Sequence, residues 1–265
     1  MEGGLPIHNK LTILIPCRFN SRRLPGKALL KIGEDPLIGL VYKNVIKSSK
    51  LLPVKPSVFV CTDSDEIINY LESENIPYLR TSNLPKNGTE RIAEALIKYK
   101  IKSEYIIDVQ GDEPFVNSEI LNLVYKNLTE SFPKPLKDLG IILPHQIISK
   151  TEADNISIVK MAIDSESKVR YLSRSLIPCN HKKEISTIGS SNFMKHLSVI
   201  GFSNKALEKY SSLKQSFLES VEDIELLRAL ENNISIISPK SSSKTFSIDT
   251  RADYLKAKKF ILKNN

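Results

Sequence analysis

The stretch LTILIPCRFNSRRLPGK, residues 11–27, combines the two features that decide the fold. Its first six residues form a short apolar run, which is typical of a β-strand covered on both faces. A loop with four cations, Arg18, Arg22, Arg23 and Lys27, follows at once around the turn signal Pro25-Gly26. We therefore expect a buried strand whose carboxyl end leads into a basic loop.

Strand-like and helix-like segments alternate through the first 115 residues. Short β-branched runs predict strands, and amphipathic segments between them predict helices. This alternation predicts an α/β fold with a mostly parallel central sheet, whose ligands bind beyond the carboxyl ends of the strands. The expected strands are residues 11–16, 57–61, 77–80 and 105–109, and the expected helices are residues 37–50, 65–74 and 90–100, the last preceded by a capping motif at Asn87.

The pattern becomes less regular after residue 115. We expect a helix at 119–130, strands at 140–143, 155–163 and 196–202, a polar loop at 179–192, a long helix at 217–231, a short strand before Asp249, and a final helix from residue 251. Neither an internal repeat nor a low-complexity linker is visible. The expected organisation is an N-terminal extension at 1–10 and a single domain at 11–265, with a smaller inserted lobe at roughly 140–215.

The composition disfavours several classes of protein, among them nucleic-acid-binding, disulfide-rich, zinc-binding and membrane-spanning proteins. The net charge of +8 favours anionic partners, but the chain has no Trp and its 9 Phe and 9 Tyr are scattered, which disfavours a nucleic-acid-binding surface. The three cysteines have neither disulfide nor zinc spacing. No run approaches the ~18 apolar residues of a membrane span, and the N-terminus lacks a signal-peptide core. We expect a cytoplasmic protein without membrane or nucleic-acid partners.

The basic loop suggests a polyanion site. A loop that leaves the carboxyl end of the first strand lies on the ligand side of the sheet. Arg18, Arg23 and Lys27 are placed there to surround several negative charges, such as those of a triphosphate. The motif is not a P-loop, because G-x-x-x-x-G-K-[ST] is absent. The simpler alternative is a surface loop with solvated cations.

Two acidic motifs suggest a divalent cation. DVQGDEP (residues 108–114) follows a predicted buried strand, and SIDTRADY (residues 247–254) precedes the last helix. Mg²⁺ takes one or two carboxylates and fills its other positions with phosphates and water. Asp112 and Asp249 are the expected ligands. Taken alone, the first motif would also suit an acidic turn, and Asp249 would suit a helix N-cap.

The motifs RFNSRRLPGK, NGTERIAEA, DVQGDEP, SRSLIP, HLSVIGF, SFLESVEDIELLRAL and SIDTRADY occur in this order. In that combination the chain resembles the 3-deoxy-manno-octulosonate (Kdo) cytidylyltransferases, or CMP-Kdo synthetases, over residues 11–262. The basic element alone is shared with other CMP-sugar synthetases. The resemblance implies a Rossmann-like nucleotidyltransferase fold, dependence on Mg²⁺, and a homodimer with a smaller lobe for dimerisation and sugar binding.

The resemblance also implies roles for individual residues. Arg18, Lys27, Asp112 and Asp249 match catalytic positions, the two aspartates as metal ligands. The nucleotide-binding set is Arg18, Arg23, Lys27, Thr89, Arg91 and Asp112, and the sugar-binding set is Gln110, Arg174, His196 and Glu225. The implied reaction couples CTP to a 3-deoxy-2-keto sugar acid, giving the CMP-sugar and pyrophosphate for cell-surface polysaccharide synthesis.

Two positions depart from the family pattern. Ile200 stands where the family commonly has tyrosine, and Leu226 where it commonly has glutamine. A site that loses a hydroxyl-binding group changes its preference strongly. These two residues therefore leave open a different acidic acceptor, such as a nonulosonate, a modified Kdo or a phosphonate.

Two further kinds of chemistry are disfavoured. Cys17 lies beside a cation, which would favour its thiolate, but direct phosphoryl displacement needs no covalent intermediate. His181 and His196 do not form a metal pair, because no other ligand stands at useful spacing from His181.

Overall fold

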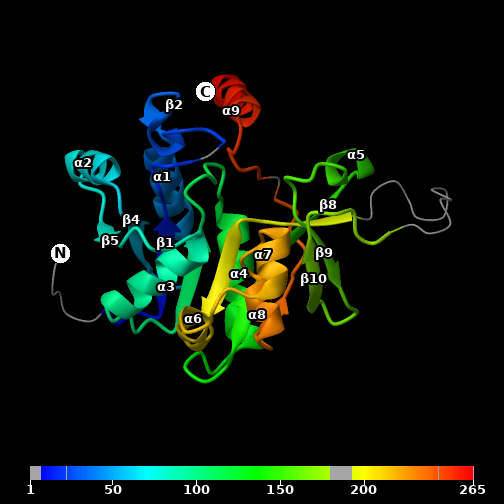
Figure 1. Ribbon diagram of the computed structural model, residues 1–265. Coiled ribbons are helices and arrows are strands. Elements are labelled where there is room, and N and C mark those ends of the chain that lie inside the picture. The colour runs from blue at the N-terminus through cyan, green and yellow to red at the C-terminus, as the bar shows by residue number, and fades with distance from the viewer. Residues whose placement is uncertain (1–6, 22, 180–192, 244, 265) are drawn as a thin grey trace.

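The computed structural model describes residues 7–21, 23–179, 193–243 and 245–264. Its centre is a seven-stranded sheet in the order β13-β7-β12-β6-β1-β4-β5 (Figure 1). The strands are β1 Leu11–Pro16, β4 Ser57–Thr62, β5 Tyr78–Arg80, β6 Tyr105–Val109, β7 Gly140–Ile142, β12 Val199–Ser203 and β13 Ser235–Ile237. Neighbours among β6, β1, β4 and β5 run parallel, whereas β12 is antiparallel to both of its neighbours. The predicted α/β fold with a mostly parallel sheet is confirmed.

Helices cover both faces of this sheet (Figure 1). On one face α1 (Leu37–Ser49), α2 (Asp65–Ser73) and α4 (Ser118–Ser131) pack on Leu11, Ile13 and Ile15. On the other face α3 (Gly88–Lys98), α6 (Asn204–Ser211) and α8 (Leu227–Glu231) pack in the same core as Leu14. Successive β1 residues point to opposite faces, so the strand needs an almost wholly apolar sequence. The remaining helices are α5 Lys150–Ala153, α7 Phe217–Glu222 and α9 Arg251–Asn264.

A second sheet, in the order β10-β9-β11-β8, lies beside the first (Figure 1). Its strands are β8 His145–Ile148, β9 Lys160–Ile163, β10 Val169–Ser173 and β11 Phe193–His196. They lie within the range expected for an inserted lobe, but β7, β12 and α6 of that range belong to the central sheet and its cover. The chain enters at Leu143-Pro144 and leaves at Leu197-Ser198, where Leu197 N–H donates to the Pro144 carbonyl at 2.8 Å. We call these four residues the neck.

Predicted strands and helices in the first 115 residues are confirmed to within two residues at each end, as is the last helix. Asn87 caps α3, since its side chain accepts from Glu90 N–H at 2.8 Å. A short hairpin of β2 (Lys31–Ile32) and β3 (Asp35–Pro36) follows the basic loop and was not predicted.

Two of the later strand predictions are wrong in part. Residues 155–159 form a turn rather than the start of β9, because the buried ammonium of Lys160 binds the carbonyls of Asn155 and Ile158 at 3.2 and 2.8 Å. The strand expected at 196–202 is divided at the neck between β11 and β12, which belong to different sheets.

Two predictions near the C-terminus also need correction. The long helix at 217–231 is divided into α7 and α8 by Asp223, whose φ is 52°. The guanidinium of Arg174 binds the carbonyls of Glu222 and Asp223 at 2.8 and 2.9 Å, which satisfies acceptors left open by the break. The short strand expected before Asp249 is irregular; there Ile248 N–H donates to the Asp112 carbonyl at 2.9 Å. The predicted loop at 179–192 lies, apart from Cys179, outside the described residues, as does His181.

Candidate active site

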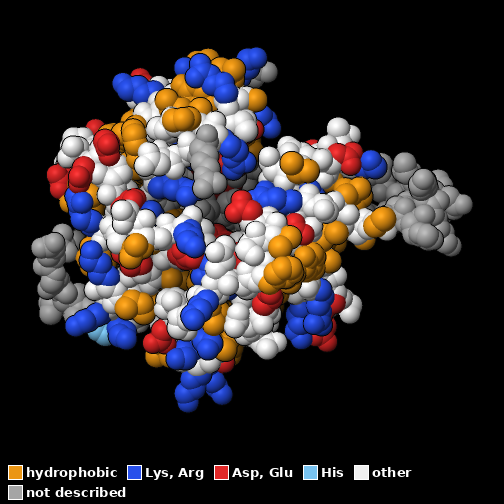
Figure 2. All heavy atoms as spheres, in the orientation of Figure 1, with side chains coloured by type: hydrophobic (Ala, Val, Ile, Leu, Met, Phe, Trp, Pro, Cys, Tyr) orange, Lys and Arg blue, Asp and Glu red, His pale blue; other side chains and the backbone are white. Residues whose placement is uncertain are grey.

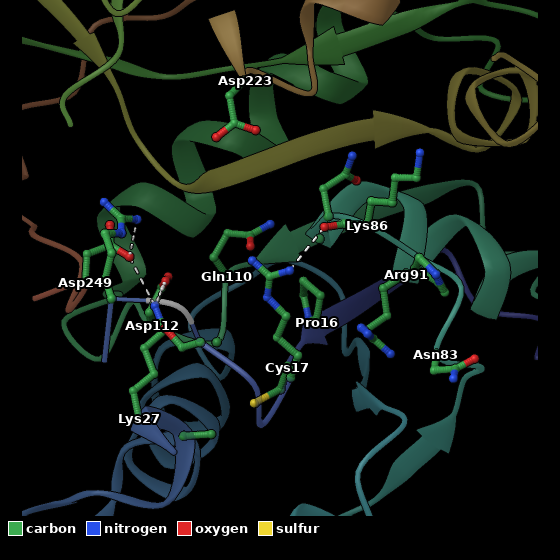
Figure 3. Close-up of a pocket in the computed structure, with 18 of the residues that line it drawn as sticks. Pro16, Cys17, Lys27, Asn83, Lys86, Arg91, Gln110, Asp112, Asp223 and Asp249 are labelled. Atoms are coloured by element: carbon green, nitrogen blue, oxygen red, sulfur yellow. Dashed lines mark hydrogen bonds and ion pairs between the residues drawn. The ribbon is translucent and has the colours of Figure 1, made fainter. Parts of the chain in front are cut away.

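A cavity of about 760 Å³ opens at the carboxyl ends of β1 and β6. Figure 2 shows Lys and Arg side chains on several sides of a hollow near the middle of one face of the molecule. Figure 3 shows Lys27, Asp112 and Asp249 at one end of the cavity, Asn83 and Arg91 at the other, and Gln110 between them. The predicted site residues that line it are Arg18, Arg23, Lys27, Arg91, Gln110, Asp112, Arg174 and Asp249.

The ammonium group of Lys27 holds the two predicted metal ligands together. Its Nζ lies 2.6 Å from Asp112 Oδ2, 3.1 Å from Asp249 Oδ1 and 3.2 Å from the Ile248 carbonyl. Lys27 follows Gly26, whose φ of 66° starts the short 3-10 turn Lys27–Leu29 and is a conformation that glycine adopts without strain. The turn thus directs a lysine from the basic loop towards two carboxylates that are distant in sequence.

Electrostatics keep Lys27 charged. Burial alone would lower its pKa, but Asp112 and then Asp249 outweigh burial, so the pKa lies above its ordinary value. Arg23 adds a second cation, with Nη2 at 2.8 Å from Asp249 Oδ1. The result is a cluster of two cations and two anions at the end of the cavity.

The donor set fits Mg²⁺. Asp112 and Asp249 supply convergent carboxylate oxygens, because both already bind one cationic group. Among the described residues no group of three or more His, Cys, Asp or Glu forms a protein-only metal cage. This matches Mg²⁺, which uses few carboxylates and completes its coordination with substrate phosphates and water.

The end of the cavity where Arg91, a predicted nucleotide-binding residue, lies contains a loop that sequence reasoning missed. Residues 83–88, here called the nucleotide loop, follow β5 and lead into α3. The Lys86 carbonyl accepts from Arg18 Nη1 at 3.1 Å. Arg91 is 4% exposed and is held by Asp63 at 3.0 Å and by the Ser82 carbonyl at 3.2 Å. The turn signals Pro85 and Gly88 mark the loop, but nothing local relates it to Arg18.

Gln110 and Arg174 also line the cavity. Gln110 Nε2 donates to the buried Asp108 at 2.7 Å, and Gly88 lies so close that an added Cβ would stand 2.5 Å from Gln110 Nε2. Asp223, at the break between α7 and α8, also lines the cavity. Its side chain is 98% exposed, and sequence reasoning missed it because the break itself was not predicted.

The lining formed by the described residues does not include Thr89, His196 or Glu225. Glu225 accepts the Thr89 N–H at 3.1 Å and so holds the first turn of α3. Burial raises the pKa of Glu225. His196 lies in β11 near the Leu197 carbonyl, and burial lowers its pKa to about 4. The predicted contact of Thr89 with the nucleotide and those of His196 and Glu225 with the sugar stay predictions.

Ile200 and Leu226 lie in the core rather than in the cavity. Each is 2% exposed and packs in the cluster beneath α3, α6 and α8, and neither is among the described residues that line the cavity. Cys17 forms part of the cavity floor, but burial raises its pKa to about 12, which keeps the thiol protonated. This agrees with the expectation that Cys17 is not a nucleophile.

Comparison with known proteins identifies the family. A family model described as cytidylyltransferase matches residues 12–236. The chain is 36% identical over 260 residues to a 3-deoxy-manno-octulosonate cytidylyltransferase of Rickettsia bellii (strain OSU 85-389), covering 97% of this chain and 98% of the relative. It is 35% identical over 253 residues to the protein of that name from Thermodesulfovibrio yellowstonii, covering 93% and 96%.

A solved structure agrees with this assignment. CMP:2-keto-3-deoxy-manno-octonic acid synthetase complexed with CTP superposes with a TM-score of 0.83 at 27% identity, covering 97% of this chain and all of that one. The chain therefore belongs to the cytidylyltransferase family, and within it to the 3-deoxy-manno-octulosonate cytidylyltransferases, which makes it a nucleotidyltransferase.

Proposed function

We propose that the protein couples CTP to Kdo, giving CMP-Kdo and pyrophosphate for cell-surface polysaccharide synthesis. The observation that carries the proposal is the contact of Lys27 with both Asp112 and Asp249 at the cavity end where the basic loop also lies. Such a cluster suits a triphosphate with a divalent cation. Family membership and the CTP complex of the structural relative support the same choice of nucleotide.

In the proposed reaction the anomeric hydroxyl oxygen of the sugar forms a bond to the α-phosphorus of CTP. The bond from that phosphorus to the bridging oxygen breaks, pyrophosphate leaves, and the hydroxyl proton passes to solvent. Catalysis of such a transfer depends on position and charge rather than on covalent chemistry. Arg18, Arg23 and Lys27 balance the triphosphate charge, and Lys27 stays protonated to stabilise the departing pyrophosphate.

Asp112 and Asp249 would hold Mg²⁺ in this proposal. The ion would neutralise phosphate charge and lower the pKa of a bound hydroxyl. Arg91, fixed by Asp63, keeps a positive charge at the nucleotide end of the cavity. Gln110 and Arg174 present polar groups on the acceptor side.

The acceptor, the assembly and the location complete the proposal. Kdo is preferred to another acidic acceptor because Ile200 and Leu226, which raised the alternative, lie in the core. A homodimer in the cytoplasm is proposed from the family resemblance. No helix in the described part of the chain is long and apolar enough to cross a membrane.

The test is pyrophosphate release from CTP with Mg²⁺ and Kdo, repeated with a panel of related keto-sugar acids and with UTP. Release with CTP and Kdo at the highest kcat/KM supports the proposal. Release only with another acid would show that this acid, and not Kdo, is the acceptor. Absence of CTP binding would overturn the assignment of CTP as the nucleotide.

A further inference from the structure

A buried arginine links α7 and α8 to α3, the helix that follows the nucleotide loop. Arg228 of α8 is 3% exposed. Its Nε and Nη2 bind the two carboxylate oxygens of Glu219 of α7 at 2.7 and 2.6 Å. The same Nη2 binds Glu90 Oε1 of α3 at 2.6 Å. One guanidinium therefore joins α3, α7 and α8.

Glu90 carries this linkage into the nucleotide loop. Its second carboxylate oxygen, Oε2, accepts from Lys86 N–H at 2.7 Å. The carbonyl of that same residue, Lys86, accepts from Arg18 Nη1. A continuous series of hydrogen bonds thus runs from Glu219 through Arg228, Glu90 and the main chain of Lys86 to the Arg18 guanidinium.

The partners of Glu90 explain why a carboxylate is needed at this position. Both of its oxygens accept from a donor, one from Arg228 and one from Lys86. An amide would offer one oxygen and would turn an NH₂ group towards a second donor, so one of the two bonds would be lost. Arg18 is exposed, and within the described part of the chain its guanidinium donates to the Lys86 carbonyl. Its orientation therefore depends on where that carbonyl stands.

We propose that Glu90 and Arg228 are positioning residues for CTP: they fix the nucleotide loop so that the Lys86 carbonyl holds the Arg18 guanidinium towards the cavity. This rests on the proposed function, because it takes the ligand at Arg18 to be the nucleotide. Neither residue lines the cavity among the described residues, so each acts through Lys86 rather than by touching the nucleotide. A side chain that is ordered before binding loses less entropy on binding.

The experiment measures CTP affinity by calorimetry and steady-state kinetics in the wild type and in Glu90→Gln. Arg228 keeps both of its bonds to Glu219 in this variant, so we expect the fold to be retained, which a urea denaturation curve checks. We expect the Kd and KM for CTP to rise about tenfold while kcat changes less than threefold. Glu208→Gln, which removes a carboxylate from an exposed pair with Lys205 on α6, is the matched control and should leave both unchanged.

A double-mutant cycle with Arg18→Ala tests whether Glu90 affects CTP binding through Arg18. If Glu90 acts through Arg18, then Glu90→Gln raises the Kd for CTP by less than twofold in the Arg18→Ala background. A second variant, Arg228→Lys, keeps the charge but loses the paired contact with Glu219, and should weaken CTP binding in the same manner.

The outcomes separate this inference from the proposed function. Failure of the wild type to bind CTP would overturn the proposed function itself. Wild-type binding together with an unchanged Kd in Glu90→Gln would overturn the positioning role alone. Full additivity with Arg18→Ala would also overturn it, as would a lower kcat at unchanged CTP affinity.

Discussion

Lys27 Nζ lies 2.6 Å from a carboxylate oxygen of Asp112, although 85 residues separate them in the chain. The contact joins the loop after β1 to the loop after β6, two strands that are neighbours in the sheet. Parallel neighbours bring their carboxyl ends to the same edge, so two loops remote in sequence meet there.

Asp112→Asn and Asp249→Asn should each lower kcat by about 10²–10³-fold, by analogy with the loss of one well-placed electrostatic group. An amide keeps the shape but removes the charge that a divalent cation needs. Pyrophosphate release at saturating Mg²⁺ measures the effect. Asp65→Asn, which removes a 76%-exposed carboxylate paired with Arg80, is the control. Near-normal activity in either cavity variant would contradict the metal assignment.

Lys27→Met should lower the free energy of unfolding by about 1–3 kcal/mol, because it removes the cation beside Asp112 and leaves Asp249 with Arg23 alone. Added Mg²⁺ should restore part of this loss, since the ion would replace the ammonium. Lys43→Met removes an exposed ion pair with Asp35 and should cost no more than about 1 kcal/mol. Urea denaturation with and without Mg²⁺ compares the two. Equal responses to Mg²⁺ would argue against a metal at Asp112 and Asp249.

Gly88→Ala should lower stability by about 1–2 kcal/mol. The new Cβ would displace the Gln110 side chain from its bond to the buried Asp108, a loss of about 1–3 kcal/mol. Alanine regains up to about 1 kcal/mol as a better helix former. In a Gln110→Ala background the three atoms nearest to the new Cβ are absent, so the same change should be neutral or stabilising. A cost that persists in that background would show that the displaced group is not Gln110.

Leu226→Gln tests whether position 226 sets acceptor preference. Leu226 is 2% exposed among apolar neighbours, so a glutamine there buries a polar group and should cost about 1–3 kcal/mol. The ratio of kcat/KM values for Kdo and a competing keto-sugar acid should not change. A changed ratio at wild-type stability would restore the specificity role that the family pattern suggested.

The neutral imidazole of His196 should make stability depend on pH. Its folded pKa is about 4, below the ordinary value of about 6.5. Between these values the unfolded chain binds a proton that the folded chain does not, so stability falls as the pH is lowered from about 6.5 to about 4. In His196→Asn the free energy of unfolding should depend less on pH between about 6.5 and about 4. The value measured at pH 7.5 serves as the reference for each protein. An unchanged slope, measured by urea denaturation, would contradict the assignment.

Strands and helices could be predicted most accurately where the local sequence pattern and the burial of the side chains agree. Strands β1, β4 and β6 are largely apolar and buried, and α2 and α3 begin at side-chain caps such as Asn87, so their bounds follow from the chain itself. The proposed metal-binding pair could be named from two acidic motifs, one directly after β6 and one directly before α9.

Tertiary contacts decided the features that the sequence did not reveal. The break at Asp223 depends on carbonyls held by Arg174, which lies 48 residues away for the Glu222 contact. The division at 196–202 depends on which sheet each half joins. The nucleotide loop takes its relation to Arg18 from Glu90 and Arg228, whose pairing crosses 138 residues. Hydrophobic periodicity contains no information about such partners.

The neck places the entry and exit of the smaller sheet side by side, joined by the hydrogen bond from Leu197 to Pro144. A segment whose two ends are adjacent can be exchanged without changing the distance that the rest of the chain must span. The piece between the two ends carries Arg174, whereas the basic loop, Asp112 and Asp249 lie outside it. The segment between Pro144 and Leu197 could therefore be replaced by that of a relative with another acceptor. The residues proposed to bind CTP and Mg²⁺ would stay unchanged.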